Sequence, residues 1–144
     1  MLEIRKVENK VDQARSVQIR TLVFVVGQNV PPDREIDAGE ETAVYYLGLE
    51  DGVPVATVRW QRGNEGMAKI ERLAVLDRCR GKGYGKSVMK KLIADLTSDP
   101  SVKKIKLGAQ DHAIPFYEAL GFSVVGDQYE DGGGIPHHDM VLKT

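Results

Sequence analysis

The sequence predicts a single domain of the mixed α/β (α+β) class over residues 1–144, in which helices pack on a central sheet. Two observations lead to this prediction. A strand-like and then a helix-like segment open the chain, three strand-like segments follow in succession, and the rest reads helix, strand, helix and two strands. A chain of 144 residues with 42% hydrophobic and 28% charged residues has the length and balance of one globular domain with a core.

The first 41 residues predict a strand, a helix and a loop. Residues 2–7 alternate apolar and polar side chains, as a short strand does. Asn9 precedes a segment whose apolar residues recur with a roughly helical period: Val11, Ala14, Val17, Ile19 and Leu22. Residues 23–41 are expected to end this helix and continue as an irregular loop, because Pro31 and Pro32 disfavour a helix interior.

Three strands are predicted next. Two apolar runs within residues 43–61 flank Asp51-Gly52, a pair suited to a tight hairpin turn with positive φ. Residues 66–76 predict the third strand, which leads into a glycine-rich stretch. A helix is expected after that stretch, and its buried face carries Val88, Leu92, Ile93 and Leu96. Asp99-Pro100 ends this helix.

The last third of the chain predicts the remaining elements. They are a strand at 103–110, a short helix at 113–122 and closing strands at 122–127 and 138–144. The polar stretch 126–136, with three consecutive glycines, is expected to be a mobile loop.

Composition excludes several classes of protein. The formal net charge of −1 gives no overall attraction to nucleic acid or anionic membranes. The sequence contains no run of about 18 apolar residues, so no membrane span is predicted. The N-terminus lacks the apolar core of a signal peptide. Cys79 is the one cysteine, so no disulfide can form within the chain. We therefore expect a cytoplasmic protein.

The stretch "RCRGKGYGKSVMKKLI", residues 78–93, lies between a predicted strand and a predicted helix. The first N–H groups of a helix have no partner within the helix, and the helix dipole favours negative charge there. Glycines lack a Cβ atom and let the backbone approach an anion closely. Because glycines alternate here with Arg80, Lys82 and Lys86, we expect the loop to hold phosphate groups.

Two well-known phosphate-binding patterns fail in this loop. The P-loop pattern G-x-x-x-x-G-K-[ST] needs a glycine at the position of Arg80. The dinucleotide pattern G-x-G-x-x-G needs one at the position of Lys86. A third pattern, [QR]-x-x-G-x-[GA], matches residues 80–85.

This motif and its surroundings resemble the GNAT family of N-acetyltransferases. Residues 70–93 look like the acetyl-coenzyme A loop of that family with its strand and helix, and residues 113–122 look like its second signature, A-x-x-F-Y-x-x-x-G-F. "VFVVGQNVPPDREID" and "GIPHHDM" resemble a bacterial subgroup in which glutamate usually stands at the position of Gly27. The resemblance covers nearly the whole chain. It implies a GNAT-like, mostly antiparallel sheet of about six to seven strands flanked by about four helices.

The resemblance also implies an activity, the direct transfer of the acetyl group of acetyl-CoA to a primary amine. The backbone of the strand before the loop is implied to pair with the pantetheine arm, with the N–H of Leu73 facing the thioester oxygen. Tyr117 is implied to protonate the leaving thiolate. The residues implied to bind the coenzyme are Leu73, Ala74, Val75, Arg80, Gly81, Lys82, Gly83, Tyr84, Gly85, Lys86 and Gln110.

The proton acceptor stays open at this point. Glu71 lies two residues before Leu73, so a regular strand would place both side chains on the same face of the sheet, near the acetyl group. Asp111, which could instead cap the short helix, and His112 are alternatives, and so is a water chain. The role of the subgroup's glutamate is lost or moved where this chain has Gly27.

Other hypotheses remain beside this one. His137 and His138 invite a metal site, but neighbouring residues of a strand face opposite ways, so no metal is expected. One of the two histidines is instead a candidate for the wall of an acceptor pocket. No histidine is placed beside Cys79 to activate it. A coenzyme-binding sensor without catalysis is the alternative function. The amine acceptor stays unidentified, nucleic acid and membrane partners are not expected, and a homodimer is possible.

Overall fold

The structure, a computed structural model, describes residues 2–30, 32 and 42–142. The predicted irregular loop lies mostly outside the described residues, at 31 and 33–41. The elements follow the predicted order: β1 Leu2–Lys6, α1 Lys10–Arg20 with a π-helical continuation Thr21–Val26, β2 Val44–Glu50, β3 Val53–Arg62, β4 Met67–Val75, α3 Tyr84–Thr97, β5 Lys104–Gln110, α4 Ile114–Glu118, β6 Phe122–Asp131 and β7 Ile135–Leu142.

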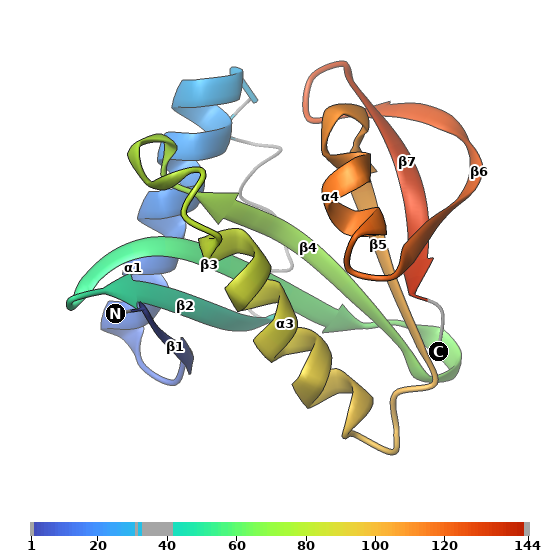
Figure 1. The fold of residues 1–144 in the computed structure, drawn as a ribbon, viewed down its shortest axis with the longest axis horizontal. Helices are drawn as coiled ribbons and strands as arrows, with labels where there is room; N and C mark the ends of the chain where they lie inside the picture. Colours follow the sequence, from blue (N-terminus) through green and yellow to red (C-terminus); the bar gives the residue numbers. More distant parts are fainter. Residues whose placement is uncertain (1, 31, 33–41, 143–144) are drawn as a thin grey trace.

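The described strands form one seven-stranded sheet in the order β1-β2-β3-β4-β5-β7-β6. Neighbouring strands are antiparallel except β4 and β5, which are parallel. This confirms the predicted mixed, mostly antiparallel sheet. In Figure 1, α1 lies behind the sheet while α3 and α4 lie in front of it. The described residues contain three α-helices besides the π-helical segment, and none of their helices is long and apolar enough to cross a membrane.

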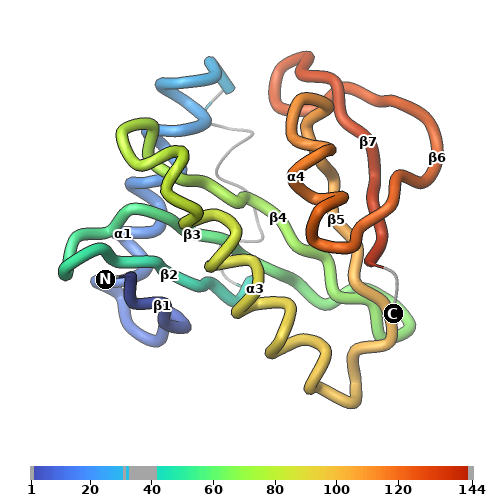
Figure 2. The backbone as a smooth tube through the Cα atoms, viewed as in Figure 1, coloured from blue at the N-terminus to red at the C-terminus, as the bar shows by residue number. Residues whose placement is uncertain are grey.

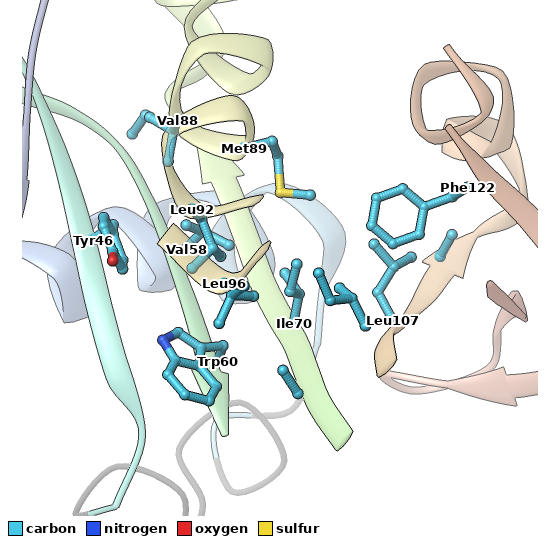
Figure 3. Packing of buried hydrophobic residues seen from close by; sticks show 14 of the residues in the cluster. Tyr46, Val58, Trp60, Ile70, Val88, Met89, Leu92, Leu96, Leu107 and Phe122 are labelled. Atoms are coloured by element: carbon cyan, nitrogen blue, oxygen red, sulfur yellow. The ribbon is translucent and has the colours of Figure 1, made fainter. Parts of the chain in front are cut away.

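The main core lies between α3 and the sheet. Val88, Leu92 and Leu96 of α3 are buried and point toward the sheet residues Val58 and Trp60 (Figure 3). Each such side chain contributes about 1.5–3 kcal/mol by its burial. The helical period predicted this buried face of α3. The packing of this face on the sheet holds the start of α3 against β4.

The other face of the sheet is covered by α1, which buries polar as well as apolar side chains. The helix begins as predicted, since the side chain of Asn9 accepts a hydrogen bond from the N–H of Asp12 at 2.8 Å. Val11 is 61% exposed, however, whereas Ser16 is fully buried and its hydroxyl lies 2.6 Å from that of Thr57. The apolar residues of the helical pattern are therefore buried only in part: Ile19 packs against Leu47 and Leu49, whereas the position of Ser16 faces a hydrogen-bonding group of the sheet.

The C-terminal hairpin is longer than predicted. The stretch 126–136, expected to be a mobile loop, instead forms the second half of β6, a turn at Gly132–Gly134 and the start of β7. All residues of β6 after Ser123 are exposed, because β6 is an edge strand. An exposed edge strand needs no apolar alternation, so the sequence signal for it was missing.

Replacing Tyr46 by phenylalanine is expected to lower the free energy of unfolding by about 1 kcal/mol at pH 7. The Tyr46 hydroxyl donates a hydrogen bond to Asp95 of α3, and this bond is the main cause that lowers the pKa of the Asp95 carboxyl. A carboxyl whose pKa is lowered on folding stabilises the protein above its unfolded-state pKa of about 3.9 and loses that effect as the pH falls through the folded-state value. Thermal unfolding at pH 7 and pH 3 checks this: the difference between the two proteins should shrink at pH 3.

Candidate active site

One large cavity opens where β4 and β5 separate. The two strands pair only from Met67 opposite Lys104 to Ile70 opposite Leu107, and they diverge toward their C-terminal ends (Figures 1 and 2). The cavity measures about 720 Å³. The glycine loop and α4 line it on one face of the sheet, and the end of the π-helical segment, β6 and β7 line it on the other. The separation of the strands therefore joins two chambers through the sheet.

A β-bulge interrupts β4 at this place. Arg72 has φ of +57°. Thr57 of β3 pairs with Ala74 and Arg59 pairs with Glu71, so β4 has one residue more than β3 between the two pairs. An extra residue reverses the faces to which all later side chains of the strand point.

The bulge separates two predicted site residues. Leu73 and Val75 pack on the core under α3, whereas Ala74 packs on the face of α1. Glu71 contacts the side chain of Arg59, which belongs to the α1 face because its neighbours in β3 pack under α3. The prediction that Glu71 and Leu73 share a face was therefore wrong, since the strand is not regular. Both residues still line the cavity, from opposite sides of the sheet.

The glycine loop leads directly into α3. Gly81 and Gly83 have φ of +82° and +79°, and a Cβ atom at either position would have no atom within 4 Å. Gly83 is the N-cap residue and offers no side chain to the helix, whose first N–H groups are therefore uncapped. An open, uncapped helix start beside a cavity fits the phosphate groups of a coenzyme.

Basic side chains surround this loop. Arg80 pairs with Asp77 at 3.5 Å and Lys82 pairs with Glu50 at 3.6 Å. These side chains are about half exposed, so the ion pairs are weak and leave the cations available to an anionic ligand. Lys86, in the first turn of α3, also lines the cavity. Of the predicted coenzyme-binding residues 80–86, all except Lys82 line the cavity.

Tyr117 of α4 lies in the wall of the cavity between the glycine loop and β5. Its ring packs edge-on against Phe116, with a centroid distance of 5.0 Å, and against Phe122. The ring is thus part of the core, but the hydroxyl makes no hydrogen bond to any described residue. Burial raises the pKa of the Tyr117 hydroxyl above its usual value, so the group stays protonated at neutral pH and can donate a proton.

Glu71 is the candidate base on the α1 side. Gln61 Nε2 donates a hydrogen bond to Glu71 Oε1 at 2.6 Å, and the fully buried Arg59 places its Nε 3.3 Å from the same oxygen. Lys69 Nζ lies 3.8 Å from the other oxygen, Oε2. The carboxylate therefore carries a local negative charge in the wall, but both of its oxygens already have partners.

The two alternative bases differ in their surroundings. Asp111 accepts hydrogen bonds from Gln128 at 2.6 Å and from His138 at 2.7 Å, and these bonds, the one from His138 foremost, lower the pKa of the Asp111 carboxyl. A carboxyl with a lowered pKa is a weaker base. His112 is exposed at the rim of the cavity, where its Nε2 lies 2.6 Å from Gln110 Oε1.

Gln110, predicted to reach the coenzyme, forms a reciprocal amide pair with Gln28. Gln28 Nε2 donates to Gln110 Oε1 at 3.1 Å, and Gln110 Nε2 donates to Gln28 Oε1 at 2.8 Å. The pair joins the helical end of the first segment to β5 across the α1 side of the cavity. Gly27, where the subgroup usually has glutamate, is the C-cap of the π-helical segment, and its neighbour Gln28 supplies the polar group at the cavity.

Sequence reasoning missed most of the α1-side chamber. Tyr129 lines it, although its region was expected to be a mobile loop, and so does His137, one of the two histidines named as candidates for the wall of an acceptor pocket. The rings of the two residues stack at a centroid distance of 5.7 Å, and the Tyr129 hydroxyl donates to Asp139 at 2.7 Å. Gly108 makes room for this tyrosine, since a Cβ there would lie 2.4 Å from the hydroxyl. The "GIPHHDM" segment was the one available signal.

Two other sequence hypotheses can be placed. Cys79 is fully buried at the base of the glycine loop, and its sulfur accepts a weak hydrogen bond from Arg78. Within the described ranges, no three His, Cys, Asp or Glu side chains come close enough together to bind a metal ion.

Comparison with known proteins agrees with this geometry. A family model described as the acetyltransferase (GNAT) domain matches residues 11–144. YjcF of Bacillus subtilis (strain 168), named an uncharacterized N-acetyltransferase, is 36% identical over 123 residues, which are 85% of this chain and 86% of YjcF. Protein ElaA of Escherichia coli (strain K12) is 34% identical over 132 residues, which are 89% of this chain and 85% of ElaA.

Solved structures show the same likeness. The crystal structure of Escherichia coli ElaA has a TM-score of 0.88 at 30% identity and covers 99% of this chain and 100% of its own. An acyl-CoA N-acyltransferase from Pseudomonas aeruginosa also has a TM-score of 0.88, at 25% identity, with the same coverage. The strand separation, the glycine loop and these matches together show that the chain belongs to the GNAT acetyltransferase family and is an acyltransferase.

Proposed function

We propose that this protein transfers the acetyl group of acetyl-CoA directly to a primary amine of a small molecule or of an exposed amino group. The single observation that carries the proposal is the cavity through the sheet. One mouth has an uncapped helix start with basic side chains, and the other has a chamber with polar and aromatic walls. A coenzyme and an acceptor can therefore meet between β4 and β5 from opposite faces.

The coenzyme would be held by the loop residues 80–86, with the backbone of Leu73, Ala74 and Val75 beside its arm. Bound acetyl-CoA supplies an acetyl group activated as a thioester. The Leu73 N–H follows the bulge at Arg72, where the ladder between β3 and β4 is interrupted, and β5 has already diverged. We propose that this N–H donates to the thioester oxygen as negative charge develops there.

The proposed proton donor is Tyr117, because its hydroxyl is protonated and faces no other partner among the described residues. Glu71 is the proposed carboxylate on the acceptor side, where its charge attracts the ammonium form of an amine and assists the loss of its proton. Gln110 is proposed to contact the coenzyme or acceptor through the amide pair with Gln28.

Saturable binding of acetyl-CoA in calorimetry, together with thiol release in the presence of one class of amine, is the expected result. The panel should contain tryptamine, spermidine, kanamycin, a peptide with a free α-amine and a peptide with a lysine. Mass spectrometry of the product should show one added acetyl group on nitrogen. A reaction without amine measures background hydrolysis.

The alternative, a coenzyme-binding sensor, gives a different outcome. It predicts saturable binding but no amine-dependent thiol release with any member of the panel. Absence of binding would contradict both functions, because both depend on the glycine loop.

A further inference from the structure

Of the described histidines, His137 is the one that is buried, and it lies on the acceptor side of the cavity. It is 9% exposed and lies in the cavity wall. Its Nδ1 lies 2.7 Å from the carbonyl oxygen of Ile135. A carbonyl oxygen only accepts hydrogen bonds, so Nδ1 carries the hydrogen and the neutral ring has its lone pair on Nε2. Nothing in the described parts of the chain hydrogen-bonds to Nε2.

Neighbouring side chains hold the ring of His137 in place. It lies opposite Gln110 of β5 and opposite Tyr129 of β6 in the sheet, so the three side chains share the α1 face. Tyr129 stacks on it at an angle of 24° between the ring planes. The Tyr129 hydroxyl is in turn fixed by Asp139, whose carboxylate pairs with Lys106 at 3.2 Å. A ring positioned in this way presents Nε2 in one direction.

The other candidate bases are less available. Both oxygens of Glu71 contact donors or cations, and both oxygens of Asp111 accept hydrogen bonds. His112 is exposed and bonded to Gln110. His137 therefore combines burial, a defined tautomer and an unoccupied lone pair in the chamber that faces the acceptor.

We propose that Nε2 of His137 is the group that takes the proton from the acceptor nitrogen, an inference that rests on the proposed amine acetylation. As the nitrogen bonds to the acetyl carbon, it gives one proton to Nε2, and as the carbon–sulfur bond breaks, Tyr117 gives one proton to sulfur. His137 then releases its proton to solvent and Tyr117 regains one, so the reaction is balanced. Glu71 attracts the ammonium form of the acceptor and assists the loss of its first proton to solvent, so that the nitrogen that attacks is neutral and has one further proton to give to His137.

The first test observes the ring itself. The chain has three histidines, so long-range ¹H–¹⁵N spectra of the imidazoles can be assigned with His137→Asn, His138→Asn and His112→Asn. At pH 8 we expect the Nδ1–H tautomer for His137. An Nε2–H tautomer would overturn the proposal, because no lone pair would then remain on Nε2. This readout needs neither coenzyme nor acceptor.

The second test compares His137→Asn with His138→Asn. Asparagine can keep the donor near the Ile135 carbonyl but cannot take a proton. We expect kcat/KM for the best amine of the panel to fall about 30-fold in His137→Asn, near the low end for a lost general base. The Kd of acetyl-CoA and the melting temperature should stay close to those of wild type. His138→Asn, which changes the neighbouring residue on the opposite face, should leave kcat/KM within about 2-fold.

The outcomes separate the two levels of inference. If wild type transfers acetyl groups and His137→Asn is equally active, the role of His137 is overturned and the acetyltransferase function stays intact. A large loss of activity in Glu71→Gln would then identify Glu71 as the base. Added imidazole should restore part of the rate of His137→Ala, because it can take the proton in place of the missing ring. A rate that does not respond to imidazole would contradict the role of His137 as the base. Coenzyme binding without transfer in wild type would instead contradict the proposed function itself.

Discussion

Replacing Gly83 by glutamate is expected to weaken the binding of acetyl-CoA by at least about 1,000-fold, the loss that corresponds to about 4 kcal/mol. Gly83 has φ of +79° and is the N-cap of α3, so any side chain there strains the backbone and projects into the space of the phosphates. A carboxylate at this helix start would also compete with the phosphates for the free N–H groups and repel them. Calorimetric titration of acetyl-CoA measures the change.

Gly52→Glu is the matched control for this variant. Gly52 has φ of +83° in the hairpin turn between β2 and β3, and a Cβ there also has no atom within 4 Å. The two variants therefore have similar backbone strain and the same added charge, but Gly52 does not line the cavity. Equal affinities in both variants and wild type would show that the glycine loop does not hold the coenzyme.

Replacing Tyr117 by phenylalanine is expected to lower kcat about 100-fold while the Kd of acetyl-CoA changes less than about 3-fold. The ring contacts with Phe116 and Phe122 are retained in phenylalanine, so only the hydroxyl is removed. Because burial raises the pKa of Tyr117, the proton donor should not ionise below about pH 10, and the wild-type rate should not fall for this reason at alkaline pH. Steady-state kinetics from pH 6 to pH 10 check both points.

Tyr46→Phe serves as the control for the loss of a tyrosine hydroxyl. Its bond to Asp95 lies under α3 and outside the cavity, so stability should fall while kcat stays unchanged. An unchanged kcat in Tyr117→Phe would remove Tyr117 from the proton transfer and leave water as the source of the proton.

The order of the elements and the glycine loop could be predicted because their signals are local. The turn at Asp51-Gly52 has positive φ at both residues, as expected, and the helical period of Val88, Leu92 and Leu96 faces the sheet. The glycines at 81 and 83 both have positive φ, a conformation that glycine adopts readily, within a few residues of the helix start.

Other features depend on contacts between distant segments. The polar face of α1 is buried because Thr57 and Tyr45, more than 20 residues away, offer partners for Ser16 and Arg20. β6 continues through an exposed polar stretch because β7 provides its hydrogen bonds. Neither feature has a signal in the local hydrophobic pattern.

The sequence by itself determined that this chain is a mixed α/β protein with a glycine loop before a helix and a tyrosine on a short helix after the fifth strand. Only the tertiary structure decided which side chains line each side of the cavity. One extra residue in β4, at Arg72, turned Glu71 away from the face of Leu73, and strand pairing brought His137 beside Gln110. The physical reason is that pattern and propensity act over a few residues, whereas register and the two faces of a sheet are set by the strand that pairs alongside.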